Sequence, residues 1–176
     1  VYHGLPKNLY GLNLNPGGYL AFLGRIAPEK RPDHAIEIAK RVGIPLKIAA
    51  KVDPADQKYF QAEIEPLLSH PLIEFLGEIT DAEKNEFLGN AMALVCPYDW
   101  PEPFGLVLIE ALACGTPVLA YRRGSIPEII DNGETGFVCD GLDEMTAAVQ
   151  GIAGIDRRRC RDAFDQRFSV VRMAQD

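Results

Sequence analysis

Residues 19–50, YLAFLGRIAPEKRPDHAIEIAKRVGIPLKIAA, carry the pattern from which the fold class follows. The short apolar run Tyr19–Leu23 predicts a strand. Apolar positions then recur at helical spacing over Pro32–Arg41, and Gly43 follows as a stop signal. Leu46–Ala50 predicts a second strand. A strand, a crossover helix and another strand are the repeating unit of a parallel sheet covered by helices.

The same alternation continues along the chain. Four further runs predict strands: Leu72–Leu76, Met92–Val95, Val118–Tyr121 and Phe137–Cys139. The helices predicted between and after them are Pro54 to about Leu68 (kinked or ended early at Pro66), a capped helix from Thr80 through Leu88, Phe104–Ala113, Ile126–Ile130, and a helical region from Leu142 that breaks near Gly151 and resumes from Asp156. We therefore predict an α/β fold with a doubly wound, Rossmann-like parallel sheet. Ligands of such sheets bind outside the carboxyl ends of the strands.

Composition excludes several classes of protein. The chain has 176 residues and a net charge of −7, which lacks the basic footprint of a nucleic-acid binder. No apolar run reaches the roughly 18 residues that span a bilayer, and no secretory leader pattern opens the chain. Four cysteines without a C-x-x-C pair, and three scattered histidines, predict no metal site and a reducing cytoplasm. Because Val1 is not an initiator methionine, we expect a fragment of a longer protein.

Three common phosphate motifs are missing. The sequence has no G-x-G-x-x-G dinucleotide fingerprint, no P-loop and no D-x-D pair that would hold a metal against a diphosphate. A bound phosphate must therefore be met by side-chain cations and helix ends. The loop after the first strand offers Arg25 and Lys30, which together would balance a diphosphate. The alternative interpretation is that Glu29-Lys30-Arg31 is only a solvated polar turn.

The segment after the fourth strand contains an unusual carboxylate. Glu110 is the only acid between Phe104 and Ala120, in a helix that is apolar all round and therefore predicted to be buried. A buried carboxylate needs donors, and none is near in sequence; a ligand with two adjacent hydroxyls would satisfy it. The alternative is a salt bridge to an arginine in the core. The helix start near Gly105 is an expected anion site, and Glu102 lies just before it.

With these residues in view, the chain resembles the carboxyl-terminal, donor-binding domain of a GT-B glycosyltransferase of family 4. Glu102 and Glu110 match the family's E-x7-E motif, within Glu102–Leu106 and Glu110–Val118. The loop Gly24–Lys30 and the segment Gly124–Gly136 match two further family segments. The resemblance covers nearly the whole chain, from Tyr2-His3-Gly4 to Phe168-Ser169. It implies an interdomain linker remnant at residues 1–18 and a nucleotide-sugar-binding domain at 19–176, with the acceptor-binding amino-terminal domain absent.

The resemblance also implies roles for residues. Arg25 and Lys30 would hold the diphosphate and stabilise it as leaving group, and Glu110 would bind the ribose hydroxyls. Glu102 and the Phe104-Gly105-Leu106 backbone would position the donor sugar, and Ile79 would meet the nucleobase. The implied enzyme retains the anomeric configuration, needs neither metal nor cofactor, and is inactive as this isolated part. No membrane contact is indicated in this half. Two positions depart from the family pattern. Arg31 stands after the lysine where many members have glycine, and Ala50-Lys51 replaces a common glycine after the second strand.

Other interpretations remain open at this point. A non-catalytic nucleotide- or phosphate-binding module of Rossmann-like fold would scatter Arg25, Lys30, Glu102 and Glu110, and a sugar-nucleotide epimerase would not explain the E-x7-E pattern. The remaining residues carry weaker expectations: Asp81 and Lys84 as solvated first-turn residues or base contacts, Tyr98 and Trp100 as a sugar-site wall or interdomain packing, Arg157, Arg158, Arg159, Arg161 and Arg167 as a charged helix face, and His3, His34 and His70 as linker or surface residues.

Overall fold

The computed structural model describes residues 3–175 and contains one six-stranded sheet in which every strand pair is parallel. The strand order is β3-β2-β1-β4-β5-β6. Their bounds are β1 Tyr19–Arg25, β2 Leu46–Lys51, β3 Ile73–Gly77, β4 Ala91–Cys96, β5 Val118–Tyr121 and β6 Gly136–Cys139. All six lie within a few residues of the predicted runs. The doubly wound, Rossmann-like prediction is confirmed.

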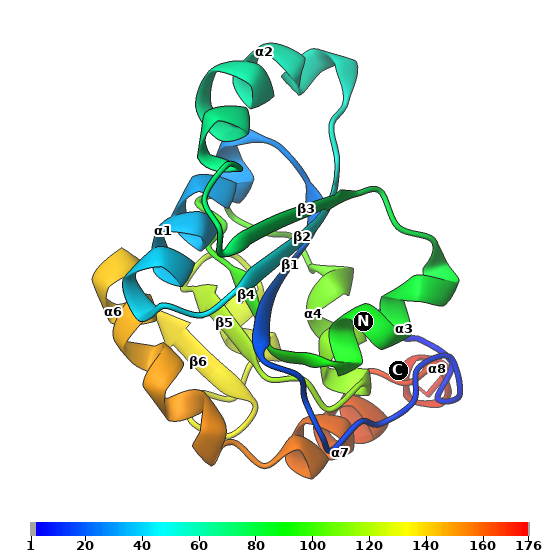
Figure 1. Ribbon diagram of the computed structural model, residues 1–176. Helices are drawn as coiled ribbons and strands as arrows, with labels where there is room; N and C mark the ends of the chain where they lie inside the picture. The colour runs from blue at the N-terminus through cyan, green and yellow to red at the C-terminus, as the bar shows by residue number, and fades with distance from the viewer. Residues whose placement is uncertain (1–2, 176) are drawn as a thin grey trace.

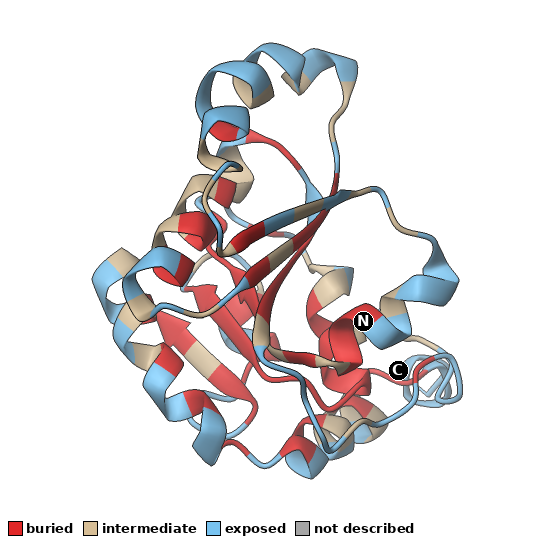
Figure 2. Cartoon of the chain, viewed as in Figure 1, coloured by how far each residue is buried: buried red, intermediate tan, exposed pale blue. Residues whose placement is uncertain are grey.

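Helices cover both faces of the sheet (Figure 1). Helices α1 (Pro32–Val42) and α6 (Leu142–Ala148) pack together on one face, and α3 (Asp81–Gly89), α4 (Leu106–Ala113) and α7 (Arg157–Arg167) lie on the other. Short helices α5 (Ile126–Ile129) and α8 (Val170–Met173) complete the set. Figure 2 shows the buried residues concentrated in the strands and on the inner helix faces. The central strands β4 and β5 are covered on both sides, as their continuous apolar runs require.

The region predicted as one helix from Pro54 is broken into short pieces. A 3-10 turn (Pro54–Asp56), α2 (Gln57–Tyr59), a π-helical turn (Phe60–Ile64) and a 3-10 turn (Glu65–Leu67) follow one another. The last contains Pro66, which lacks the N–H that a continuing α-helix needs. Only Ile64 of this region is fully buried, so packing imposes little regularity.

The prediction of a charged, solvated helix face at the arginine run is wrong for two of its members. Arg157 is 8% exposed and donates to the carbonyl oxygens of Asn13, Gly89 and Ala91 and to the hydroxyl of Thr116. Arg161 similarly donates to three main-chain carbonyls, those of Lys7, Tyr10 and Ala113. Carbonyl groups at segment ends attract a guanidinium because its donors form a fixed fork.

The segment before β1 lies against α3, α4 and α7. Leu5 forms a bridge with Ser169, Tyr10 is 5% exposed, and Asn13 accepts from Arg157 and donates to Asn90. Residues 1–2, where the linker match begins, are outside the described residues. The four cysteines are free and buried. Among residues 3–175, no helix is long and apolar enough to cross a bilayer.

Candidate functional site

A cavity of about 630 Å³ opens at the carboxyl edge of the sheet. It lies near β1, where the strand order reverses, with β2 on one side of β1 and β4 on the other. This is the position at which doubly wound sheets bind ligands. Seven of the eight residues predicted for the donor site line it: Arg25, Lys30, Ile79, Glu102, Gly105, Leu106 and Glu110. They come from three segments, residues 25–30, 79 and 102–110, which are distant in sequence and meet only in the folded chain.

Phe104 is the exception. Its ring packs edge-on against those of His3 and Phe168, with centroids 4.9 and 6.2 Å away, and it does not line the cavity. The predicted helix also begins two residues late, at Leu106, because Gly105 adopts φ +74° as its N-cap. Leu106 is 49% exposed, so the expectation of an entirely buried helix is wrong on the face that borders the cavity.

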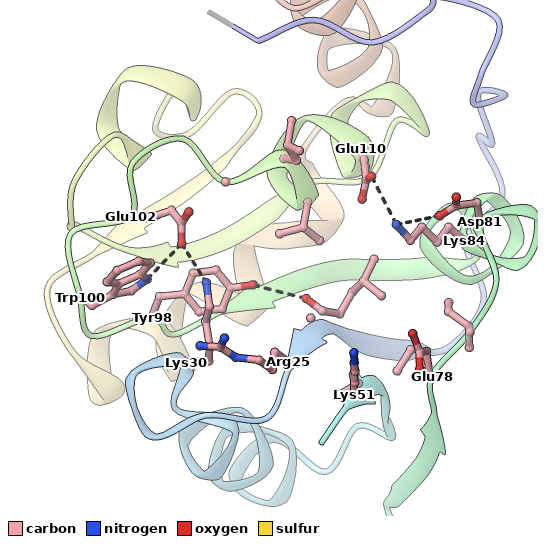
Figure 3. A pocket seen from close by; sticks show the side chains of 18 residues that line it. Arg25, Lys30, Lys51, Glu78, Asp81, Lys84, Tyr98, Trp100, Glu102 and Glu110 are labelled. Atoms are coloured by element: carbon pink, nitrogen blue, oxygen red, sulfur yellow. Dashed lines mark hydrogen bonds and ion pairs between the residues drawn. The ribbon is translucent and has the colours of Figure 1, made fainter. Parts of the chain in front are cut away.

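Lys30 lies between a carboxylate and two aromatic rings (Figure 3). Its ammonium is 2.9 Å from Oε2 of Glu102 and 4.1 Å from the ring centre of Tyr98. The indole N–H of Trp100 donates to the same Glu102 oxygen at 3.0 Å. The Lys30 and Glu102 side chains are 18% and 11% exposed, so this ion pair is mostly shielded from water. Lys30 is therefore not a residue of a solvated turn.

Glu102 is held by its main chain as well. Its carbonyl oxygen accepts from both the N–H and the hydroxyl of Ser125, at 2.9 Å each. Gly124 has φ +53°, and a Cβ there would lie 2.3 Å from that carbonyl oxygen. The Gly124–Gly136 match with the family thus begins with a glycine that lets a loop approach the main chain of Glu102.

Arg25 is more open, and three acids surround it. Its guanidinium is 3.0 Å from Glu29 and 3.8 Å from both Asp53 and Asp56, with 47% of the side chain exposed. Both cations predicted to meet phosphate are therefore paired with carboxylates in the ligand-free chain. A bound diphosphate would have to replace part of these contacts, which costs less at Arg25 because water already reaches it.

Glu110 has donors that sequence reasoning missed. The ammonium of Lys84, on α3, is 3.6 Å from its Oε1, and the hydroxyl of Tyr10 also favours its ionised form. Burial nevertheless raises the pKa of Glu110 above its usual value, against the opposing effects of Lys84 and Tyr10. Neither a core arginine nor the ligand alone satisfies this carboxylate. The expectation that Lys84 is a solvated first-turn residue is wrong: its side chain is 25% exposed.

Sequence reasoning missed other cavity residues or left them undecided. Lys51, Glu78, Asp81 and Lys84 line the cavity, as do Tyr98 and Trp100, which settles the position of the two aromatic residues at this site. The signal for Lys51 and Glu78 was their position at the ends of β2 and β3. Within residues 3–175, no group of three His, Cys, Asp or Glu side chains is arranged to hold a metal ion.

His34 is not simply a surface residue. Its Nε2 is 2.5 Å from the Arg31 guanidinium, which can only donate, so Nε2 is the acceptor and Nδ1 carries the proton. Nδ1 is 2.8 Å from the Tyr121 hydroxyl and therefore donates to it. Burial, and secondarily the charge of Arg31, lower the pKa of His34. Arg31 itself has φ +50°, in the left-handed region that favours glycine.

Comparisons with known proteins agree with this architecture. The family model described as "Glycosyl transferases group 1" matches residues 13–157. A D-inositol 3-phosphate glycosyltransferase of Rhodococcus erythropolis is 35% identical over 141 residues, which cover 74% of this chain and 32% of the relative. A glycogen synthase of Mycobacterium tuberculosis is 34% identical over 173 residues, covering 89% of this chain and 41% of the relative. The chain thus spans only about a third to two fifths of these relatives.

Solved structures show the same fold. Anabaena Alr3699/HepE in complex with UDP and glucose superposes with a TM-score of 0.83 at 22% identity, covering 98% of this chain and 53% of that one. The C-terminal domain of LpcC, a glycosyl transferase group 1 family protein of Francisella tularensis, superposes with a TM-score of 0.76 at 21% identity, covering 95% of this chain and 100% of that domain. The fold matches over almost the entire chain.

Proposed function

The chain belongs to the group 1 glycosyl transferases, and from that premise we propose that it is the donor-binding domain of a retaining, family 4 enzyme. The enzyme would transfer a sugar from a nucleotide-sugar to an acceptor that a further domain binds. The observation that supports this most directly is the convergence of Arg25, Lys30, Glu102 and Glu110 on one cavity. A module with unrelated roles for these residues gives no reason for them to meet.

We assign the parts of the donor to different parts of the cavity. Arg25 and Lys30 would bind the diphosphate, beside the positive amino end of α4. Glu110 lies one and a half turns further along this helix and would accept the ribose hydroxyls. Glu102 and the main chain of Gly105 and Leu106 would position the sugar. The structure of Anabaena Alr3699/HepE is a complex with UDP and glucose, which supports a nucleotide-sugar as the donor.

The nucleobase would occupy the part of the cavity that the diphosphate, ribose and sugar leave free. Ile79, which follows β3, lines that end together with Glu78 and Lys51. The side chain of Phe104 is instead part of the packing beneath the site, so its contribution would be limited to placing Gly105. This assignment gives the base an apolar neighbour and two charged ones.

The proposed chemistry uses side-chain cations rather than a metal or cofactor. As the sugar leaves, negative charge develops on the outer phosphate, and fixed cations there stabilise the transition state more than the ground state. Lys30 would carry most of this effect because it is the more shielded of the two cations. Residues 1–18 would connect to the acceptor domain, without which the chain binds donor but transfers nothing. We also propose that the enzyme is located in the reducing cytoplasm.

The test is a binding panel by calorimetry and thermal shift with UDP, GDP, ADP and their glucose or mannose conjugates. At least one nucleotide should bind and raise the melting temperature, since a ligand of the folded state stabilises it. Lys30→Met should weaken that affinity roughly 10-fold to 100-fold, the effect of losing a charged hydrogen bond. Lys40→Met removes the same charge from the exposed side of α1 and should bind like wild type. Absence of binding across the panel, or equal binding by both variants, would refute the proposal.

A further inference from the structure

Glu110 is contacted by two segments other than its own helix. Lys84 approaches from α3, 3.6 Å from Oε1, and Tyr10 approaches from the segment before β1. The Glu110 side chain is 13% exposed, and its carboxylate borders the cavity. Figure 3 shows Glu110 and Lys84 meeting at one end of the cavity, at a distance from Lys30 and Glu102. This second charged cluster is separate from the one expected to hold the phosphates.

The two partners are themselves fixed in place. Lys84 lies in the first turns of α3, where Thr80 and Glu83 form a reciprocal capping box. The next residue, Asn85, accepts a hydrogen bond at 2.9 Å from the N–H of Gly11, which follows Tyr10. Tyr10 is 5% exposed, so its ring is held by packing. The hydroxyl and the ammonium therefore reach Glu110 from a framework that has already formed without ligand.

We propose that Lys84 and Tyr10 are positioning residues that fix the Glu110 carboxylate as the acceptor for a ribose diol, so that this chain selects ribonucleotides over 2′-deoxyribonucleotides. The inference rests on the proposed function. A carboxylate has about four lone-pair directions, more than Lys84 and Tyr10 together can fill. Because the Glu110 carboxylate borders the cavity, the acceptor sites left over are open to a ligand there. Two adjacent hydroxyls match two adjacent acceptor sites.

The charge of Lys84 has a second effect. Burial raises the pKa of Glu110, and a protonated carboxyl accepts fewer hydrogen bonds. The groups that face Glu110 are Lys84 and Tyr10, which favour its ionised form, and Asp81, which disfavours it. The buried Tyr98 hydroxyl and Cys114 thiol also interact with it. The ammonium of Lys84 is shared with Asp81 at 3.2 Å. Removing the lysine therefore leaves the negative charge of Asp81 near Glu110 without a compensating cation.

A direct contact between Lys84 and the ligand is the competing explanation. If the ammonium touched a phosphate or the base, its loss would weaken ribonucleotides and deoxyribonucleotides by the same factor. If it acts through Glu110, its loss weakens the ribonucleotide, which offers two hydroxyls, more than the deoxyribonucleotide, which keeps only the 3′-hydroxyl. The ratio of the two affinities separates these roles, and a general loss of stability does not move it.

The experiment measures dissociation constants of UDP, GDP and ADP, each beside its 2′-deoxy counterpart, for wild type, Lys84→Met, Tyr10→Phe and the control Lys40→Met. Wild type and the control should prefer the ribonucleotide by about tenfold or more, the effect of one hydrogen bond to a charged group. In Lys84→Met the preference should fall to within about threefold, Tyr10→Phe should be intermediate, and Lys84→Arg should restore most of it. Lys84→Gln replaces the methionine variant if that one does not fold.

Two results would overturn the inference while leaving the proposed function intact. One is nucleotide binding in which Lys84→Met leaves both the ribonucleotide and the deoxyribonucleotide affinity at their wild-type values. The other is an equal loss for both sugars. A pH series gives an independent check: ribonucleotide affinity should fall on acidification, beginning at a higher pH in Lys84→Met than in wild type. Failure of every nucleotide to bind the wild-type chain would instead refute the proposed function.

Discussion

Replacing Arg157 with methionine tests the largest correction that the structure makes to the sequence interpretation. This side chain connects α7 to three distant places along the chain, at Asn13, Gly89–Ala91 and Thr116. Its donors lie 2.7 Å from the Asn13 carbonyl, 3.0 Å from that of Ala91, 2.7 Å from that of Gly89 and 2.9 Å from the Thr116 hydroxyl. Methionine keeps much of the apolar stem and removes all four bonds.

The expected loss of stability follows from these contacts. Four hydrogen bonds at a net value of about 1 kcal/mol each give about 4 kcal/mol. Against this, the folded chain no longer has to bury a guanidinium, whose pKa is lowered by burial. We expect a net loss of about 3 kcal/mol, within the range for breaking buried charged contacts. For a chain of this length, that corresponds to a melting temperature lower by about 6–12 °C.

The measurement is urea denaturation followed by circular dichroism, with Arg158→Met as the matched control. Arg158 is the next residue of α7, its side chain is exposed, and its loss should change the free energy of unfolding by less than about 0.5 kcal/mol. Arg157→Lys should recover only part of the loss, because an ammonium does not reproduce the planar fork. The reasoning is refuted if Arg157→Met unfolds within about 1 kcal/mol of Arg158→Met.

Two further predictions concern the loop behind Glu102 and the histidine beside Arg31. Gly124→Ala should cost at least about 2 kcal/mol more than Gly133→Ala, because both glycines have positive φ but only the first would place a Cβ against the main chain of Glu102. Equal unfolding energies would contradict the close approach. Because the pKa of His34 is lowered on folding, the unfolded chain binds that proton more tightly, and stability is lost as pH falls below about 6.5. His34→Gln should flatten this part of the pH profile, and an unchanged profile would show that His34 does not contribute.

The sequence by itself determined the fold class and the edge of the sheet that carries the site. The alternation of apolar runs with helical stripes predicted a parallel sheet, since only parallel strands with crossover helices bury such runs on both faces. The E-x7-E spacing and the two cations after β1 were sufficient to select Glu102, Glu110, Arg25 and Lys30. Local patterns are sufficient for these four residues because each lies within a few residues of a predicted strand end or helix.

Tertiary structure alone decided which groups the charged residues contact. Lys84 and Tyr10 reach Glu110 from 26 and 100 positions away in sequence, and Arg157 gathers a hydroxyl and three carbonyls from 41 to 144 positions away. No local pattern marks such pairs, because a charge is drawn to whichever donor or acceptor the packed chain places beside it. For the same reason an arginine run resembled a solvated face, and a carboxylate that seemed to need a ligand already had two partners.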